Sequence, residues 1–392
     1  MTSVRKGGPL FEPLRLRGLT LANRVAVSPM TQYSAEDGTP VPWHAMHVGS
    51  MAVSGAGLVI MEATAVEAAA RTTSGCLGLY SDANEAALTR LVADIRTFAD
   101  TPLGIQLVHS GRRASVRKPW DPRPANADTV KLPIEEGGWP ICGPTDQPYR
   151  GDVHVPEALD EQGIARVLAA YAAAAARADR SGFDLLELHG AHGYLMHSFF
   201  SPISNTRTDA WGGDAARRMR FPLAMVKAVR ATWPDHKPLG VRLPGSDFIE
   251  GGLTIMDAVA LGREMKMLGV DYLVPSIGLL DSKFRAPVVE PGYMVPFAEQ
   301  LRKQVGGPVM ATGMILTPHQ AEAVVQEGRA DMVAMGRAFL NDPRWGWHAA
   351  AALGGAVEIP RQYSRGAPGA WPGYDLRRRP QHSGDAERQA AE

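Results

Sequence analysis

Short apolar runs alternate with amphipathic segments along this chain, and no other feature restricts its possible folds as strongly. Eight runs have the composition of buried strands, at residues 24–28, 57–62, 104–109, 183–188, 239–243, 271–276, 308–312 and 332–335. Seven amphipathic segments predict helices, at residues 44–54, 83–98, 161–179, 216–232, 254–268, 296–305 and 318–327. Eight alternating units favour a protein of the α/β class, a (β/α)8 TIM barrel, over a doubly wound sheet with a second domain.

Two segments interrupt this alternation. Residues 117–160 are rich in Pro, Asp, Gly and Trp and lack helical periodicity, so we expect a long loop after the third strand that partly covers the barrel mouth. The last residues are polar and rich in Pro, Gly and Arg. The sequence therefore predicts a single barrel domain at residues 1–366 and a partly disordered tail at residues 367–392.

Charge and cysteine content narrow the classes of function. The chain has 41 basic and 41 acidic residues, so no overall charge attracts it to nucleic acid or to an anionic membrane, and we expect a small-molecule ligand. No segment resembles a signal peptide or is long enough to span a bilayer, which predicts a cytoplasmic protein. With only Cys76 and Cys142, a four-cysteine iron–sulfur or zinc site is excluded.

Two imidazoles and a phenol follow the apolar run at residues 183–188. His189, His192 and Tyr194 would therefore stand at the carboxyl end of a buried strand, where barrel enzymes carry their chemistry. Imidazoles can hold a carbonyl oxygen or a metal, and a phenol can donate a proton. Taken alone, the motif is also compatible with two hydrogen-bonded core histidines and a packing tyrosine.

Polar residues stand at the carboxyl ends of other predicted strands as well. They are residues 31–33, Glu62, Gln106, His109 and Arg242. Barrel interiors are normally filled by branched apolar side chains, so a buried glutamine and arginine need polar partners. A flat cofactor with polar edges would supply such partners.

The last two strand–helix units carry glycines that suit an anion. Gly313 follows the seventh predicted strand, and Gly336 with Arg337 follows the eighth, where barrels commonly bind phosphate. The sequence contains neither a GxGxxG motif that opens a βαβ unit nor a P-loop. It therefore gives no support for a Rossmann domain, and any nicotinamide would have to visit the site of another cofactor.

With these residues in view, the chain resembles the old yellow enzyme family of FMN-dependent ene-reductases, from about residue 10 to residue 366. The motifs that carry the resemblance lie at residues 21–24, 28–33, 37–38, 57–66, 104–114, 188–195, 198–209, 212–213, 240–243, 311–314 and 336–343. Residues 118–120 and 362–366 resemble the bacterial subgroup that includes the xenobiotic reductases.

The resemblance implies an NAD(P)H:flavin oxidoreductase with FMN as cofactor and NADPH or NADH as reductant. It implies reduction of C=C bonds conjugated to a carbonyl or nitro group, by hydride transfer from flavin N5 to the β-carbon. His189 and His192 would bind the activating oxygen, and Tyr194 would protonate the α-carbon. Tyr33 would lie at the substrate, together with Arg365 of the partner subunit, so the resemblance also implies a homodimer or higher homo-oligomer.

The resemblance also implies a set of flavin contacts. Those expected to hold FMN are Ser28, Pro29, Met30, Thr31, Ala63, Gln106, Arg242, Gly313, Gly336 and Arg337. Thr31 is a departure, because the bacterial subgroup usually has Cys there and the classical branch has Thr. His192 matches the bacterial subgroup, whereas the classical branch often has Asn at this position.

Three alternatives remain beside this interpretation. A metal-dependent barrel hydrolase would use His109, His189 and His192, although the sequence offers no convincing carboxylate ligands for it. A flavin dehydrogenase acting in the oxidative direction would share the flavin motifs. A non-catalytic flavin-binding barrel would share them too, but would not need both histidines and Tyr194.

Overall fold

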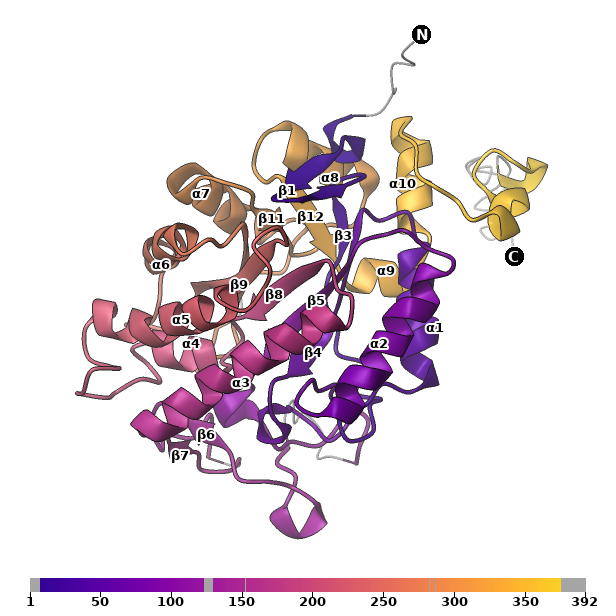
Figure 1. Cartoon of the computed structure of the whole chain (residues 1–392). Helices are drawn as coiled ribbons and strands as arrows, with labels where there is room; N and C mark the ends of the chain where they lie inside the picture. The colour runs from indigo at the N-terminus through magenta and orange to yellow at the C-terminus, as the bar shows by residue number, and fades with distance from the viewer. Residues whose placement is uncertain (1–7, 123–129, 152, 282, 286, 375–392) are drawn as a thin grey trace, which may run out of the picture.

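Eight parallel strands form the centre of the molecule in the computed structural model, which describes residues 8–122, 130–151, 153–281, 283–285 and 287–374 (Figure 1). The strands lie in the order β10-β9-β8-β5-β4-β3-β12-β11. A parallel bridge between Leu273 and Val309 joins the two outer strands, so the sheet closes into a barrel. The predicted (β/α)8 TIM barrel is confirmed.

The barrel strands are short. All of their residues are buried, apart from one position each in β4, β9 and β10. Their bounds are β3 Val25–Val27, β4 Leu58–Ala65, β5 Leu103–Val108, β8 Leu185–His189, β9 Leu239–Ser246, β10 Tyr272–Ile277, β11 Met310–Ala311 and β12 Met332–Met335. Burial on both faces explains why the sequence shows continuous apolar runs rather than alternation.

Helices surround the sheet, and most follow a strand. The α-helices are α1 Pro42–Ala52, α2 Asp82–Arg96, α3 Glu161–Arg180, α4 Leu195–Phe200, α5 Ala215–Arg230, α6 Ile255–Met267, α7 Val295–Val305, α8 Pro318–Gln326, α9 Arg337–Asn341 and α10 Trp345–Leu353. The short 3-10 helices are η1 Pro9–Phe11, η2 Ala68–Ala70, η3 Gly111–Arg113, η4 Ile134–Glu136 and η5 Arg361–Gly366.

The structure corrects the predicted elements in two respects. The helices α4, α9 and α10 were not predicted, because two are too short to show a period and the third is apolar on most of its surface. Strand β4, the second of the predicted strands, also runs beyond its predicted end at Glu62, to Ala65. Glu62 is only 4% exposed, so its charge did not mark the end of the buried strand.

A small antiparallel hairpin covers the amino-terminal end of the barrel. Its strands are β1 Leu14–Leu16 and β2 Leu19–Leu21. Leu16 and Leu21 are buried in a cluster with the first residues of several barrel strands, among them Leu58, Leu185 and Met332. This cluster closes the barrel opposite to the end where the predicted site residues lie.

The long segment after β5 is a loop, as predicted, and its described residues contain little regular structure. It holds η4 and a two-stranded parallel sheet of β6 Cys142–Gly143 and β7 Glu157–Ala158. The ring of Trp120, on this loop, lies edge-on to Tyr33 with the ring centroids 5.8 Å apart. One side of the loop therefore reaches the residues expected at the substrate.

Beyond α10 the chain leaves the barrel and projects from its side (Figure 1). Residues 361–366 are exposed, and the predicted tail continues to residue 392, of which residues 375–392 lie outside the described part. Both cysteines are free; Cys76 is buried, whereas Cys142 is partly exposed. Among the described residues, none of the helices combines the length and apolar character needed to cross a lipid bilayer.

Candidate active site

A cavity of about 440 Å³ opens at the carboxyl ends of the barrel strands. Its lining comes from the segments that follow β3, β10, β11 and β12, together with the loop after β8. The predicted site residues in the lining are Ser28, Pro29, Met30, His192, Gly313, Gly336 and Arg337. Its volume lies within the usual range of small-molecule and cofactor sites.

His189 and His192 form a hydrogen-bonded pair at the edge of this cavity. His189 is the last residue of β8, and its Nε2 lies 3.1 Å from Nδ1 of His192. The backbone N–H of Ala191 donates to Nδ1 of His189 at 3.2 Å, so a neutral His189 carries its proton on Nε2. His192 then accepts at Nδ1 and donates from Nε2 to Oγ of Ser276, at 2.6 Å.

This chain of donors agrees with the electrostatics of the pair. Burial, with Arg242 and Arg113 nearby, lowers the pKa of His192 to about 3. Burial, together with the neighbouring His192, places the pKa of His189 well below its usual value. Both imidazoles are therefore neutral donors near pH 7, and the N–H of His192 points to the cavity side.

Tyr194 stands against the same pair. Its ring centroid lies 4.7 Å from that of His189, and its phenol oxygen accepts a hydrogen bond from Oγ1 of Thr72 at 3.4 Å. The guanidinium of Arg113 lies 5.9 Å from the ring centroid. The structure thus brings the three predicted catalytic residues together within one cluster of rings.

Tyr33 lies close to this cluster, on the loop that follows β3. Burial, with Tyr194 nearby, raises the pKa of Tyr33, so its phenol stays protonated at physiological pH. Its φ of 51° is in the left-handed region, which is uncommon for a tyrosine and marks a tightly held backbone.

A buried polar network occupies the barrel centre beneath the site. Glu187 is fully buried, and its Oε1 accepts from Nε2 of Gln106 at 2.6 Å. The same oxygen lies 3.4 Å from Nε of Arg242, and Oε2 accepts from the Tyr272 hydroxyl at 3.0 Å. Arg242 also donates to Oγ of Ser28 at 3.0 Å. The predicted buried glutamine and arginine thus find their partners in a carboxylate that the sequence analysis did not single out.

Thr31 and Ala63 lie on neighbouring segments above this network. Ala63 is in register with Gln106 across β4 and β5. Thr31 precedes Gln32, whose backbone N–H donates to the buried Glu62 carboxylate at 3.0 Å. This bond ties the loop after β3 to the middle of β4.

The other end of the cavity carries the residues expected to bind an anion. Gly313 has φ of 94°, and a Cβ there would lie 2.5 Å from Met294, so only glycine fits. Gly336 precedes α9, and the Arg337 side chain lines the cavity beside it. One end of the cavity therefore offers backbone amides and a guanidinium. Gln106 and Arg242 lie outside this lining, but Arg242 donates to Ser28, which is part of it.

That distribution fits FMN. A guanidinium and loop amides suit its terminal phosphate, and amide and guanidinium donors suit the polar edge of its ring. Between these ends, Met30, Ala334 and Met335 provide apolar contact for a flat aromatic system. The residues present are thus chemically matched to this cofactor along the length of the cavity.

Some predicted residues lie elsewhere. His109 is bound to Glu67, with Nε2 to Oε1 at 2.9 Å, and Cys142 Sγ lies 3.7 Å from the same nitrogen. Within the described ranges, no three His, Cys, Asp or Glu side chains are placed to hold a metal ion. The histidine set expected for the hydrolase alternative is therefore not assembled. Arg365 lies exposed on η5 and is not part of this cavity's lining.

Three residues at the site received no role from the sequence. Ser276 accepts from His192, Glu187 holds Gln106 and Arg242, and Arg113 donates to the backbone oxygen of His192 at 2.8 Å. Ser276 ends a predicted strand, so its position was an available signal. The pairings of Glu187 and Arg113 depend on contacts between distant segments, which a single sequence does not reveal.

Comparisons with known proteins agree with this geometry. Residues 9–353 match the model of the NADH:flavin oxidoreductase / NADH oxidase family. A protein named NADPH dehydrogenase, from Geobacillus sp. (strain WCH70), is 38% identical over 360 residues, which cover 91% of this chain and 98% of the relative.

Solved structures with the same fold include two enzymes of known type. Morphinone reductase has a TM-score of 0.74 and 28% identity, with 92% of this chain and 93% of that chain covered. An old yellow enzyme homologue from Zymomonas mobilis has a TM-score of 0.68 and 26% identity, with 85% and 90% covered.

Proposed function

Since the chain belongs to the NADH:flavin oxidoreductase / NADH oxidase family and is an oxidoreductase of the old yellow enzyme type, with FMN as cofactor and NAD(P)H as reductant, we propose that it is an ene-reductase. Its substrates are small molecules that contain a C=C bond conjugated to a carbonyl or nitro group. When bound, FMN would supply the redox chemistry, passing a hydride equivalent from NAD(P)H through its N5 to the β-carbon of such a bond.

The two histidines bind the oxygen of the conjugated group. His192 donates its Nε2 proton to Ser276 at 2.6 Å, and a substrate oxygen that replaces Ser276 as acceptor receives the same proton. His189 becomes a second donor to this oxygen when its Nε2–H group points to the substrate instead of to His192. Donors that are already oriented stabilise the charge that develops on this oxygen as hydride arrives.

Tyr194 supplies the proton for the α-carbon. Its phenol lies in the same cluster as both imidazoles, and Thr72 donates to the phenol oxygen, which leaves the phenol proton free to point away from Thr72. Tyr33 and Trp120 border the substrate on the side of the long loop. A phenol in this position is a competent general acid.

The remaining site residues orient the cofactor. Gln106 and Arg242 would contact the polar edge of the flavin ring, and Gly313, Gly336 and Arg337 would hold its phosphate. The other proposed flavin contacts are Ser28, Pro29, Met30, Thr31 and Ala63. The support is the cavity, whose lining includes Gly313, Gly336 and Arg337 as well as His192 of the histidine pair.

A second subunit completes the substrate site. Arg365 is exposed on a segment that projects from the barrel, and this arrangement suits an arm that reaches another copy. Arg365 of the partner subunit would enter the substrate side of the site, which requires at least a homodimer.

The clustering of His189, His192 and Tyr194 at the cavity edge is the observation that carries this proposal, and Tyr194→Phe tests it. We expect the oxidation of reduced enzyme by 2-cyclohexenone to slow by about 100-fold or more, because the general acid is lost, while reduction by NADPH is unchanged. Stopped-flow flavin absorbance under anaerobic conditions measures the two half-reactions separately.

Tyr80→Phe provides a matched control. Tyr80 is a half-buried phenol that contacts Asp37 at 3.4 Å and lies outside the site. Both half-reactions should keep their rates in this variant. An unchanged rate of enone reduction in Tyr194→Phe would instead remove Tyr194 from the reaction.

A further inference from the structure

The turn between β8 and α4 carries both His192 and Tyr194, and it places His192 in an unfavourable backbone conformation. His192 has φ of 57° and Gly193 has φ of 72°, so two successive residues adopt the left-handed region. For a histidine this conformation costs of order 1–3 kcal/mol and persists only where surrounding contacts impose it. The contacts that impose it therefore determine where the His192 ring lies.

His197, in the first turn of α4, holds the middle of this turn. The backbone N–H of Gly193 donates to Nδ1 of His197 at 2.9 Å, within the interior of the molecule. Ser198 donates to the oxygen of Gly193 at 2.9 Å. Because Nδ1 accepts a hydrogen bond, a neutral His197 has its proton on Nε2.

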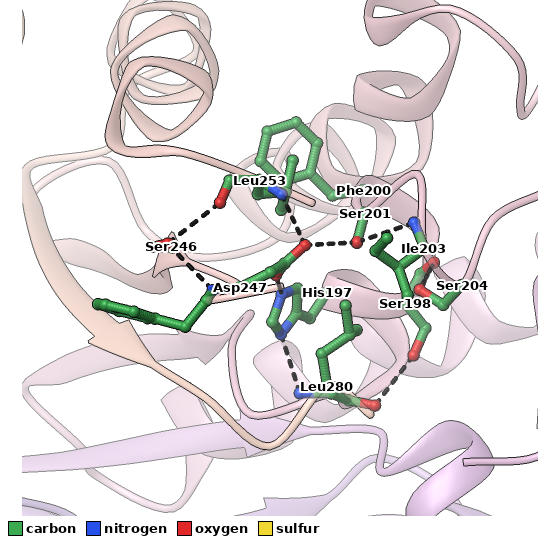
Figure 2. Close-up of polar contacts among 12 residues, drawn as sticks. His197, Ser198, Phe200, Ser201, Ile203, Ser204, Ser246, Asp247, Leu253 and Leu280 are labelled. Atoms are coloured by element: carbon green, nitrogen blue, oxygen red, sulfur yellow. Dashed lines mark hydrogen bonds and ion pairs between the residues drawn. The ribbon is translucent and has the colours of Figure 1, made fainter. Parts of the chain in front are cut away.

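Asp247 fixes that proton position. The Nε2 of His197 lies 2.7 Å from Oδ1 of Asp247, directly after β9, and both side chains are fully buried. Oδ2 accepts from the Ser201 hydroxyl at 2.6 Å and from the backbone N–H of Leu253 at 2.7 Å. Figure 2 shows His197 and Ser201 directed at the Asp247 carboxylate, with Leu253 on its far side. Although burial opposes ionisation, these donors lower the pKa of Asp247.

The Ser–His–Asp composition of this cluster does not make a hydrolytic triad. Ser201 donates to the aspartate rather than to the imidazole, and the second imidazole nitrogen is occupied by a backbone amide. All three side chains have no exposed surface, so no substrate reaches the hydroxyl. The cluster can act only through the residues that it holds.

We propose that His197 and Asp247 are positioning residues for the reduction, because they hold the left-handed turn at residues 192–193 and thereby set the place of the His192 ring and the Tyr194 phenol. This inference rests on the proposed function of His192 and Tyr194. The Asp247 carboxylate selects the tautomer of His197 that is protonated on Nε2. In that tautomer, Nδ1 is free to accept the hydrogen bond from the backbone N–H of Gly193.

Asp247→Asn tests the proposal with a side chain of nearly the same shape. Ser201 and Leu253 both donate to one oxygen, so the amide oxygen of asparagine stays there and its NH2 group faces His197. The imidazole must then accept at Nε2 and carry its proton on Nδ1, where it opposes the N–H of Gly193. The variant thus removes the hold on the turn without emptying any space.

In the Asp247→Asn holoenzyme, we expect 2-cyclohexenone to oxidise the reduced flavin about 10- to 100-fold more slowly than in the wild type. The apparent affinity for the enone should also be weaker, because the His192 ring and the Tyr194 phenol are misplaced. NADPH reduction of the flavin should stay within about twofold, a range that small conformational changes still allow. Nitrogen-15 NMR of histidine-labelled holoenzyme reports the tautomer independently of turnover, and His197 should change from a protonated Nε2 to a protonated Nδ1. Ser201→Ala is the matched control, because it removes one bond to the same carboxylate and leaves the tautomer unchanged.

A second pair of variants keeps the test decisive if Asp247→Asn does not fold. His197→Asn retains an acceptor near the place of Nδ1, whereas His197→Leu has none, and neither reaches Asp247. The enone affinity should be largely kept by the asparagine and lost by the leucine. Equal losses in both variants, or a tautomer change in Asp247→Asn without an effect on enone reduction, would overturn the positioning role.

The failure of the underlying function has a different signature. If Tyr194→Phe leaves enone reduction unchanged, the proposed reaction itself is wrong, whatever the tautomer of His197. If Tyr194→Phe slows the reaction and the tautomer variant does not, only the positioning role is lost.

Discussion

At the scale of single residues, the site depends on keeping its two histidines neutral. The Ala191 amide donates to Nδ1 of His189 and so places the proton of His189 on Nε2. His189 then donates to His192, and His192 donates to Ser276. A protonated His192 would present a second proton to His189 and break this order. The low pKa values of the pair follow from burial and from the neighbouring arginines, so the site keeps its donors over the physiological pH range.

This has a consequence for stability that can be measured. The pKa of His192 falls from 6.5 to about 3 on folding. Between these values the unfolded chain binds more protons, so the free energy of unfolding decreases as the pH drops from 6.5 towards 3 and is fully present above 6.5. Denaturant titrations across this range give the free energy of unfolding at each pH. Its slope against pH should be shallower for His192→Asn than for the wild type, by an amount that corresponds to at most one bound proton. Equal slopes for the two proteins would contradict the assignment of a neutral His192.

Glu187 leads to a second prediction at this scale. Its buried carboxylate balances Arg242 and holds Gln106. In Glu187→Gln the negative charge is lost, so reduced flavin, which carries more negative charge, becomes more favourable beside Arg242. We expect the two-electron potential of bound FMN to rise by about 30 mV or more, equivalent to a tenfold change in the equilibrium. Tyr272→Phe removes a donor but no charge and serves as the control; an equal potential in wild type and Glu187→Gln would show that Glu187 does not act on the flavin.

A single sequence reveals some residues of this site but not others. His189, His192 and Tyr194 were identifiable because they follow an apolar run within six residues. Glu187 lies inside such a run, and its role depends on Arg242 and Tyr272, which are far away in the sequence. Pairings of this kind come from the closure of the barrel and are not encoded in any local pattern.

At the scale of elements, burial decided which predictions succeeded. The barrel strands are apolar because both of their faces are covered, so their positions were evident, although β4 continues past the buried Glu62. The helices α4 and α9 have six and five residues, fewer than two turns, and no periodicity can reveal them.

The hairpin at the amino-terminal end of the barrel is an element whose contribution can be isolated. Leu21 is 1% exposed and packs with Leu58 and Met332 beneath the strands. Leu21→Ala should lower the free energy of unfolding by about 2–5 kcal/mol, because it leaves a cavity in this cluster. The neighbouring Thr20 is exposed, so Thr20→Ala should change stability by no more than about 0.5 kcal/mol. Denaturant unfolding measures both, and similar effects would mean that the hairpin does not seal the barrel.

At the scale of the whole molecule, the segment beyond α10 distinguishes a single barrel from an assembly. It projects from the barrel and carries Arg365 and the half-exposed Tyr363, whose ring lies over Arg344. We expect sedimentation to give at least twice the mass of one chain. Arg365→Ala should raise the KM for the enone without changing that mass, whereas a fully active monomer would contradict a shared site.

We propose that this barrel uses bound FMN to pass hydride from NAD(P)H to a conjugated alkene, and the visible spectrum of the purified holoenzyme follows both transfers in one experiment. In an anaerobic cuvette, NADPH should bleach the flavin absorbance, and 2-cyclohexenone should then restore it with formation of the saturated ketone. A flavin that is bleached by NADPH but not restored by the enone would contradict the proposed substrate class. A colourless protein that cannot be reconstituted with FMN would contradict the account as a whole.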